Sequence, residues 1–115
     1  MVAGDHYVPG RGDLVWLQFN PRAEHEQAGE RPALVISPLS YNQRVGLALM
    51  CPVTSKVKGY PFEVLLPADL PVSGVVLADQ IKSLDWRARG ARFICRVPEK
   101  VMREVIEKLQ LLIFL

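Results

Sequence analysis

The hydrophobic pattern of this chain changes its period once, close to the C-terminus. Before the change it consists of short apolar segments separated by polar residues, glycine and proline, at 14–19, 33–37, 47–53, 62–66, 75–78 and 91–97. Segments of this length and spacing predict strands in a small barrel or a strongly twisted antiparallel sheet. Between the second and third segments, residues 38–46 are predicted to form a turn or a short 3₁₀ segment.

The C-terminal segment has a helical period instead. Its apolar residues fall on one helical stripe: Val101, Met102, Val105, Ile106, Leu109, Leu112 and Ile113. We therefore expect an amphipathic helix that covers one side of the barrel, with a partner-binding helix as the alternative. The predicted fold class is mainly β with a C-terminal helix (α+β).

The first predicted strand is apolar on both faces. Alternation places Leu14, Trp16 and Gln18 on one side and Val15, Leu17 and Phe19 on the other. Either both faces are buried within the chain, or one faces the core and the other a second subunit. Trp16 and Trp86 are interpreted as packing residues, whereas Phe19 and Tyr60 are left open as packing residues or platforms for nucleobases.

Length and composition indicate one domain over residues 1–115. The chain is 50% hydrophobic, which suits a single core. Its longest uninterrupted apolar run, Leu111–Leu115, is too short to span a membrane. The N-terminus has no pattern of a signal peptide, so we expect a cytoplasmic protein without a membrane partner.

The two cysteines, Cys51 and Cys95, are far apart and belong to no Cys/His ligand cluster. We interpret them as reduced, half-buried thiols, since a disulfide is rare in the cytoplasm. The pattern predicts no metal site and no cofactor. A catalytic cysteine paired with His6 or His25 is the alternative.

Positive charge is concentrated in two parts of the chain, although the net charge is only +2. Within eleven residues lie Lys82, Arg87, Arg89 and Arg92, and Lys56 and Lys58 precede them. Such a surface attracts phosphates, or it is simply a solvated charged face.

The polar segment 20–31 is a candidate site. It carries His25, Glu26 and Arg31 between two apolar strand-like segments. Charged loops held between rigid strands are typical places for binding and catalysis. The alternative is that Glu26 and Arg31 form a surface ion pair.

Six stretches in order resemble the MazF/PemK/Kid family of bacterial toxin endoribonucleases. They cover residues 11–16 (RGDLVW), 25–35 (HEQAGERPALV), 51–55 (CPVTS), 58–64 (KGYPFEV), 74–80 (GVVLADQ) and 85–90 (DWRARG). The resemblance runs from about Tyr7 into the C-terminal helix and is nearer to the MazF branch than to the Kid branch. It implies an SH3-like barrel of the MazF/PemK/CcdB plasmid maintenance toxin type.

The resemblance also implies a function and partners. The implied function is metal-independent cleavage of single-stranded RNA at a short sequence, giving a 2′,3′-cyclic phosphate and a 5′-hydroxyl. The implied assembly is a homodimer. The implied partner is a MazE-like antitoxin whose disordered, acidic tail covers the RNA site.

Catalytic roles carry over to three positions of this sequence. Glu26 matches the general base and Arg31 the residue that stabilises charge on the phosphate, because an arginine is a poor proton donor near neutral pH. Thr54 matches a hydroxyl residue that positions a phosphate oxygen. His25 and Asp79 match residues with functional roles in the Kid branch, but the catalytic Arg of that branch is Leu77 here. The resemblance therefore implies that His25 and Asp79 are catalytic or base-contacting residues.

The remaining candidates bind RNA rather than react with it: Lys56, Lys58, Gln80, Lys82 and Arg87. Two other functions stay open beside an RNA-cleaving enzyme. One is a non-catalytic SH3-like binding module, because a fold does not dictate function. The other is a toxin directed at gyrase, against which the set Glu26, Arg31 and Thr54 argues.

Overall fold

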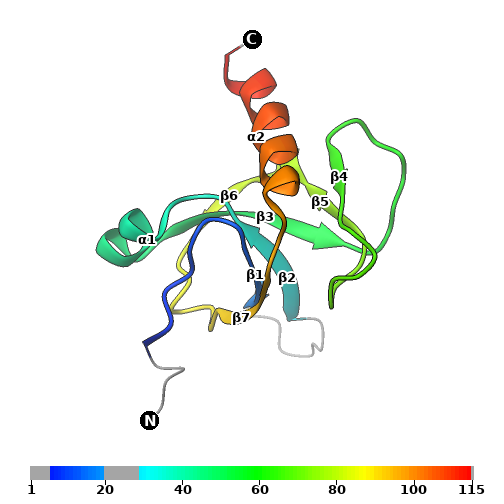
Figure 1. Cartoon of the computed structure of the whole chain (residues 1–115). Coiled ribbons are helices and arrows are strands. Elements are labelled where there is room, and N and C mark those ends of the chain that lie inside the picture. The colour runs from blue at the N-terminus through cyan, green and yellow to red at the C-terminus, as the bar shows by residue number, and fades with distance from the viewer. Residues whose placement is uncertain (1–5, 20–28, 115) are drawn as a thin grey trace.

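The computed structural model describes residues 6–19 and 29–114. In these residues a seven-stranded antiparallel sheet precedes a long C-terminal helix (Figure 1). The elements are β1 (Asp13–Gln18), β2 (Glu30–Val35), α1 (Leu39–Val45), β3 (Ala48–Thr54), β4 (Glu63–Leu65), β5 (Val75–Leu77), the 3₁₀ helix η2 (Ala78–Gln80), β6 (Lys82–Leu84), β7 (Arg92–Arg96) and α2 (Glu99–Ile113). The predicted fold class is confirmed.

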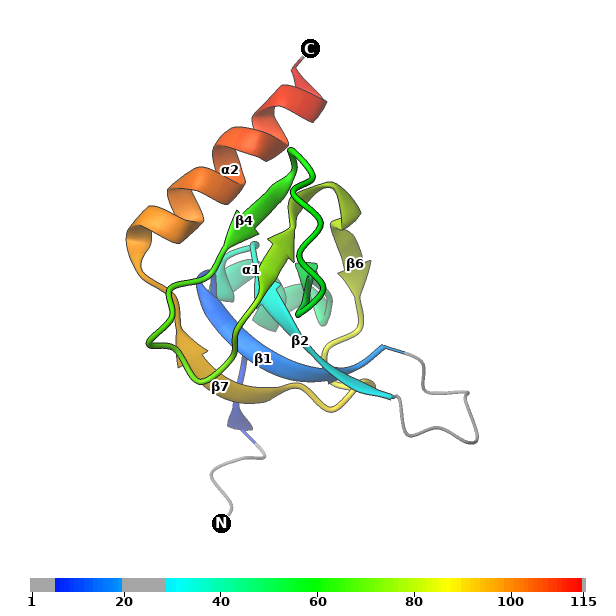
Figure 2. The ribbon, with the colours of Figure 1, turned by 90° about the vertical axis from the view of Figure 1, so that its right-hand side faces the viewer.

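Strand β3 pairs with three other strands, β2, β5 and β6. The strands follow the order β4-β5-β3-β2-β1-β7, and β6 also pairs with β3. The first half of β3 pairs with β6, and its last two residues, Val53 and Thr54, pair with Val76 and Val75 of β5. Figure 2 shows β1 and β2 curving beneath β4 and β5. The end of β3 therefore lies at a junction of several strands.

The two faces of the central strands belong to two separate cores. Leu14, Leu34 and Cys51 pack in a cluster with α2, whereas Val15 and Met50 pack in a second cluster that contains Trp86. Leu14 on one face of β1 and Val15 and Leu17 on the other are fully buried within the chain, whereas Trp16 and Gln18 are only partly buried. Trp86, 4% exposed, is a packing residue as predicted.

Helix α2 covers one side of the sheet, as its period predicts. Its buried residues are Val101, Met102, Val105 and Leu109. The last turn extends beyond the core, so Leu112 and Ile113 are 48% and 69% exposed. Figure 2 shows α2 lying across the molecule beside β4.

Three local expectations were wrong. Residues 39–45 form an α-helix rather than a turn or 3₁₀ segment, and the helix ends at Gly46, whose φ of 82° places it in the left-handed region. Strand β2 begins at Glu30, inside the expected polar loop, because its partner β1 continues to Gln18. Strand β6 was not predicted, since its sequence Lys-Ser-Leu has too little apolar character and is held by β3.

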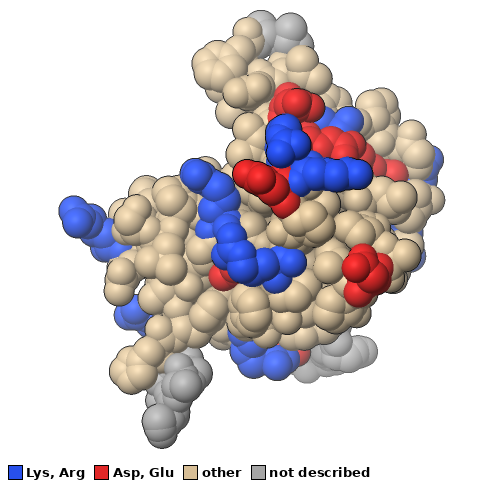
Figure 3. Space-filling model, in the orientation of Figure 1, with Lys and Arg blue, Asp and Glu red and all other residues tan. Residues whose placement is uncertain are grey.

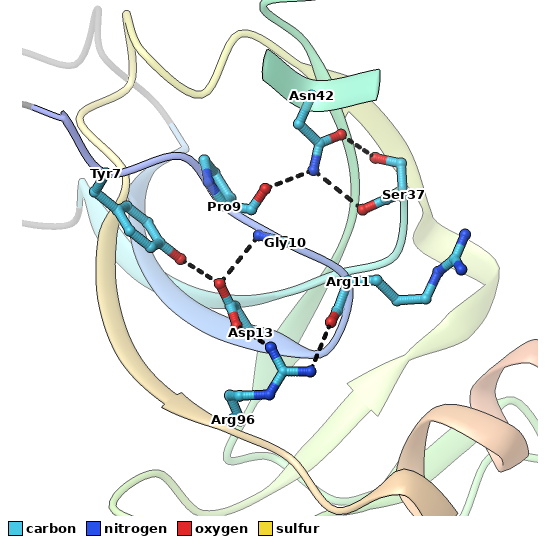
Figure 4. Close-up of polar contacts among 8 residues, drawn as sticks. All are labelled: Tyr7, Pro9, Gly10, Arg11, Asp13, Ser37, Asn42 and Arg96. Atoms are coloured by element: carbon cyan, nitrogen blue, oxygen red, sulfur yellow. Dashed lines mark hydrogen bonds and ion pairs between the residues drawn. The ribbon is translucent and has the colours of Figure 1, made fainter. Parts of the chain in front are cut away.

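A polar network ties the N-terminal segment to the sheet (Figure 4). The buried Asn42 amide donates to the carbonyls of Pro9 and Ser37. Asp13 is 5% exposed and accepts hydrogen bonds from the Tyr7 hydroxyl at 2.7 Å and the Gly10 N–H at 3.0 Å. These contacts satisfy polar groups that would otherwise be costly to bury.

Both thiols are free, as expected. Cys95 is partly buried as predicted, whereas Cys51 is fully buried rather than half-buried because it lies in the core that packs against α2. Burial, reinforced by the negative charge of Asp79, raises the pKa of Cys51 to about 12. No helix in the described part of the chain is long and apolar enough to cross a bilayer.

Candidate functional site

Two adjoining pockets lie where β2, β3 and β5 meet. The first, here called the Arg31 pocket, has a volume of about 360 Å³ and is lined by Phe19, Arg31, Pro52, Val53, Thr54, Leu77, Gln80 and Lys82. The second, the Asp79 pocket, has about 320 Å³ and is lined by Thr54, Lys56, Lys58, Tyr60, Glu63, Leu77, Asp79 and Gln80. Thr54, Leu77 and Gln80 line both, so the two pockets form adjacent parts of one site.

Strand pairing brings Arg31 and Thr54 together from different parts of the chain. Arg31 lies on β2 opposite Leu17 of β1, and β2 also pairs with β3, where Ala33 lies opposite Pro52. Thr54 is the last residue of β3. A cationic fork and a hydroxyl on neighbouring strands form a site that can hold a phosphate group.

Gly74 fixes the backbone beside Thr54. A Cβ atom at this position would lie 2.1 Å from the Thr54 carbonyl oxygen, and the φ of Gly74 is +122°. Only glycine permits this approach and this conformation. Thr54 therefore packs against Gly74, and it also pairs with Val75 of β5. Its side-chain oxygen accepts the Lys56 N–H at 3.1 Å.

The segment 55–62 forms one wall of the Asp79 pocket and is fixed by a carboxylate. Glu63 accepts the N–H groups of Lys58 and Gly59, each at 3.0 Å, through its two oxygens. The Lys108 ammonium group of α2 donates to the Pro61 carbonyl at 2.7 Å. Because its backbone is held at these points, the segment presents Lys56, Lys58 and Tyr60 in a defined arrangement.

Asp79 joins this wall to η2. The Tyr60 hydroxyl donates to Oδ2 of Asp79 at 2.8 Å, which raises the pKa of Tyr60. Oδ1 of Asp79 is buried and accepts no hydrogen bond from the residues that the structure describes. An unpaired buried carboxylate oxygen is unusual and points to a functional position.

The structure brings most of the predicted residues together. Arg31, Gln80 and Lys82 line the first pocket, whereas Lys56, Lys58 and Asp79 line the second. Arg87 lines neither pocket, since its guanidinium group lies 4.9 Å from the centre of the Trp86 ring. His25 and Glu26 lie outside the described residues.

Sequence reasoning missed the role of Glu63 and left Tyr60 ambiguous. Glu63 fixes the wall through backbone N–H groups, a contact that no residue pattern reveals. Phe19, also ambiguous, lines the Arg31 pocket. The charged residues that line the Arg31 pocket are both basic, whereas the Asp79 pocket has two lysines and two carboxylates. On α2, Figure 3 shows acidic and basic side chains intermixed.

Comparison with known proteins gives a consistent result. Residues 10–113 match the family model described as "PemK-like, MazF-like toxin of type II toxin-antitoxin system". The endoribonuclease toxin MazF of Escherichia coli K12 is 48% identical over 107 residues, which cover 93% of this chain and 96% of the relative. The endoribonuclease PemK of Escherichia coli is 36% identical over 86% of this chain and 77% of its own length.

Solved structures agree with this comparison. A crystal structure of MazF from Deinococcus radiodurans has 59% identity and a TM-score of 0.86, covering 95% of this chain and 99% of that one. A MazE–MazF complex from the same organism has 55% identity and a TM-score of 0.84, covering 93% and 96%.

Proposed function

The chain belongs to the PemK-like, MazF-like family of toxins of type II toxin–antitoxin systems, and we propose that it is a sequence-specific endoribonuclease that cuts single-stranded RNA without a metal ion. Relatives that match nearly the whole chain are named endoribonucleases, which supports this activity. The products are a 2′,3′-cyclic phosphate and a 5′-hydroxyl.

The observation that carries the proposal is the Arg31 pocket. Cleavage needs attack of the RNA 2′-oxygen on the adjacent phosphorus, loss of the 2′-proton to a base, and departure of the 5′-oxygen, which receives a proton. Negative charge develops on the two non-bridging oxygens. In this mechanism Arg31 binds these oxygens through two N–H groups, and Thr54 orients one of them. Both residues line the pocket.

Proton transfer is assigned to the preceding polar segment. We assign Glu26 as the general base that takes the 2′-proton. His25 is the second candidate for a proton-transfer role, because imidazole groups in general exchange protons in the physiological pH range. Both assignments rest on the family resemblance, because these two residues lie outside the described part of the chain.

RNA binding is assigned to the side chains that surround the reacting group. Lys82 and Gln80 lie on the Arg31 side and Lys56 and Lys58 on the Asp79 side. Lysines in these positions attract the phosphates that flank the scissile bond. Arg87, which lies outside both pockets, extends this basic surface only if the RNA passes over Trp86.

The partners proposed for this chain follow from its relatives. A MazF of 55% identity was solved in complex with MazE. We therefore assign a MazE-like antitoxin, with a disordered acidic tail, as the inhibitor that occupies the basic site. The chain acts as one domain, residues 1–115, in a cytoplasmic homodimer.

The decisive experiment measures cleavage of a long single-stranded RNA by the purified protein in excess EDTA, with the product ends mapped by sequencing. Arg31→Ala should lower the rate at least about 100-fold, because it removes the charge that stabilises the transition state. Arg92→Ala is the matched control, since Arg92 pairs with Glu30 at 2.7 Å and lines neither pocket. A folded Arg31→Ala variant that cuts as fast as the parent would refute the mechanism.

A further inference from the structure

The segment that joins β3 to β4 buries very little of itself. Residues 55–61 are all exposed, although this segment carries Lys56 and Lys58, which are assigned to the phosphates of the RNA. A stretch with so few buried apolar contacts opens easily unless polar contacts fix its backbone. The position of the two lysines therefore depends on the hydrogen bonds that the segment makes with its surroundings.

Glu63, the first residue of β4, holds the segment on one side. Its Oε2 accepts the Lys58 N–H and its Oε1 accepts the Gly59 N–H, each at 3.0 Å, and its own N–H donates to the Tyr60 carbonyl at 3.0 Å. Successive backbone N–H groups that converge on one point form an anion-binding arrangement. Here the anion is a carboxylate of the same chain, so the backbone closes on Glu63.

Lys108 of α2 holds the same segment on the other side. Its ammonium group donates to the Pro61 carbonyl at 2.7 Å. The helix is a firm support, because Val105 and Leu109 are 0% and 6% exposed. Within the described part of the chain neither Glu63 nor Lys108 takes part in an ion pair. Both charges are therefore directed at backbone groups of the segment.

We propose that Glu63 and Lys108 are positioning residues for RNA binding, which hold the backbone of residues 58–61 so that Lys56 and Lys58 are in place before the RNA arrives. This inference rests on the proposed RNA-cleaving function and adds two residues that act through the lysines. Neither contacts the RNA, and Glu63 transfers no proton although it lines the Asp79 pocket. Ordering one long side chain only on binding would cost a factor of about 3 to 10 in affinity.

Two competing roles make different predictions. A general acid or base at Glu63 would act in the chemical step, so its loss would lower kcat and remove one limb of the pH profile of kcat. A Lys108 that binds phosphate directly would contribute about 0.7 to the slope of log Kd against log salt concentration. Loss of a positioning residue raises KM and leaves the pH profile and the salt slope unchanged.

The test measures kcat and KM on a short single-stranded RNA that carries the mapped cleavage motif. Glu63→Gln sets a side-chain amide N–H against a backbone N–H, and Lys108→Met removes the ammonium group but keeps an unbranched chain. Each should raise KM about 3- to 10-fold and leave kcat within about 2-fold of the parent. Global destabilisation would instead lower the fraction of active enzyme, and hence the apparent kcat, at an unchanged KM.

A conservative variant and two matched controls complete the series. Lys108→Arg keeps a donor for the Pro61 carbonyl and should return KM to within about 2-fold of the parent. Lys100→Met removes an exposed ammonium group from α2, and Asp69→Asn converts an exposed carboxylate into an amide; both residues lie outside the two pockets. Both controls should keep the KM and kcat of the parent.

Amide hydrogen exchange tests the segment directly. Lys108 touches neither the Lys58 nor the Gly59 N–H, which donate to Glu63. In Lys108→Met these two amides should nevertheless exchange at least about 3-fold faster, because release of the Pro61 carbonyl loosens the whole segment. Unchanged exchange in this variant would show that Lys108 does not hold the segment and would overturn its role.

Binding measurements keep this test distinct from that of the proposed function. The same RNA with a 2′-deoxy residue at the cleaved position cannot react, so its affinity and salt slope report binding alone. If the parent does not cut RNA but Glu63→Gln and Lys108→Met weaken its binding at an unchanged salt slope, the cleavage proposal fails and the positioning role stands.

Other outcomes overturn the inference. A parent that cuts RNA, with unchanged KM and affinity in both variants, would overturn it and leave the cleavage proposal intact. A lower kcat with a missing pH limb in Glu63→Gln would make Glu63 a proton-transfer group. A salt slope smaller by about 0.7 in Lys108→Met would make Lys108 a phosphate ligand. A parent that binds no RNA would overturn both proposals.

Discussion

Two aspartates in this molecule each accept a hydrogen bond from a tyrosine hydroxyl, but they differ in their other hydrogen-bond partners. Tyr7 donates to Oδ2 of Asp13 at 2.7 Å, and Tyr60 donates to Oδ2 of Asp79 at 2.8 Å. Around Asp13 the Gly10 N–H and the Arg96 guanidinium group, at 3.0 Å each, complete the set (Figure 4). Around Asp79 the described residues supply no further donor to Oδ1.

The difference separates a carboxylate whose two oxygens are both hydrogen-bonded from one that has an unpartnered, buried oxygen. Asp13, the first residue of β1, connects this strand to the N-terminal segment through Tyr7 and Gly10 and to β7 through Arg96. Both oxygens of Asp13 accept hydrogen bonds within the protein, which identifies a structural role. Asp79 lines a pocket, and the one of its oxygens that lacks a partner among the described residues is buried. The two sites share a tyrosine hydrogen bond and differ in whether both carboxylate oxygens have a partner.

The largest effect should come from removal of the saturated carboxylate. Asp13→Ala leaves the Tyr7 hydroxyl and the Gly10 N–H without an acceptor, and should lower the free energy of unfolding by about 2–3 kcal/mol. Asp79→Ala removes one bond to an exposed tyrosine and should change it by less than about 1 kcal/mol. Urea denaturation of both variants measures the difference.

Arg96→Ala serves as the control for the network. The Arg96 side chain is 65% exposed, so water replaces much of its contact with Asp13 and the loss should stay near about 1 kcal/mol. Equal losses in the free energy of unfolding for Asp13→Ala and Asp79→Ala would show that the number of hydrogen bonds accepted does not distinguish the two carboxylates.

The next largest effect should be a loss of stability at alkaline pH through the Tyr7–Asp13 contact. Burial first, and then the hydrogen bond and negative charge of Asp13, raise the pKa of Tyr7, with Arg96 opposing them. A pKa higher in the folded than in the unfolded chain gives stability that is present below about pH 10 and lost as the pH rises further. The free energy of unfolding should fall above about pH 10, by less than about 1.4 kcal/mol per pH unit from this group.

Tyr7→Phe isolates this contribution. The Cys51 thiol, whose pKa is raised to about 12, adds loss of the same sign above about pH 9 in both proteins. Above about pH 10 the free energy of unfolding should therefore fall less steeply with pH in Tyr7→Phe than in the parent. An equal fall in both proteins would mean that the Tyr7–Asp13 contact does not control alkaline stability.

The strands that the sequence predicts are those with enough apolar residues to be recognised locally. β1 and β3 are clear because both of their faces are buried in the two cores. β6 was missed since its three residues form a strand only against β3. The helix at Leu39–Val45 was missed because it is short and buries Asn42 rather than an apolar stripe.

The site residues were also predicted only in part. Composition alone pointed to the charged segment and the lysines, whereas the roles of Arg31 and Thr54 came from the family resemblance. The adjacency of Arg31 and Thr54 depends on the register of β1, β2 and β3. The Tyr60–Asp79 contact joins residues nineteen positions apart across a pocket. Such a contact is set by tertiary structure, so no local pattern predicts it.

The smallest effect should be a shift in the ionisation of Tyr60. Its hydrogen bond to Asp79 is the main cause that raises its pKa, followed by the negative charge of that carboxylate. Asp79→Asn removes the charge and should return the pKa towards the ordinary value of about 10. The tyrosinate absorbance of each protein, minus that of its Tyr60→Phe counterpart, isolates this group among the three tyrosines. Asp69→Asn should leave it unchanged. A Tyr60 pKa that Asp79→Asn does not lower would mean that the hydroxyl is not anchored on Asp79 in solution, and the aromatic wall of the pocket would then lose its fixed position.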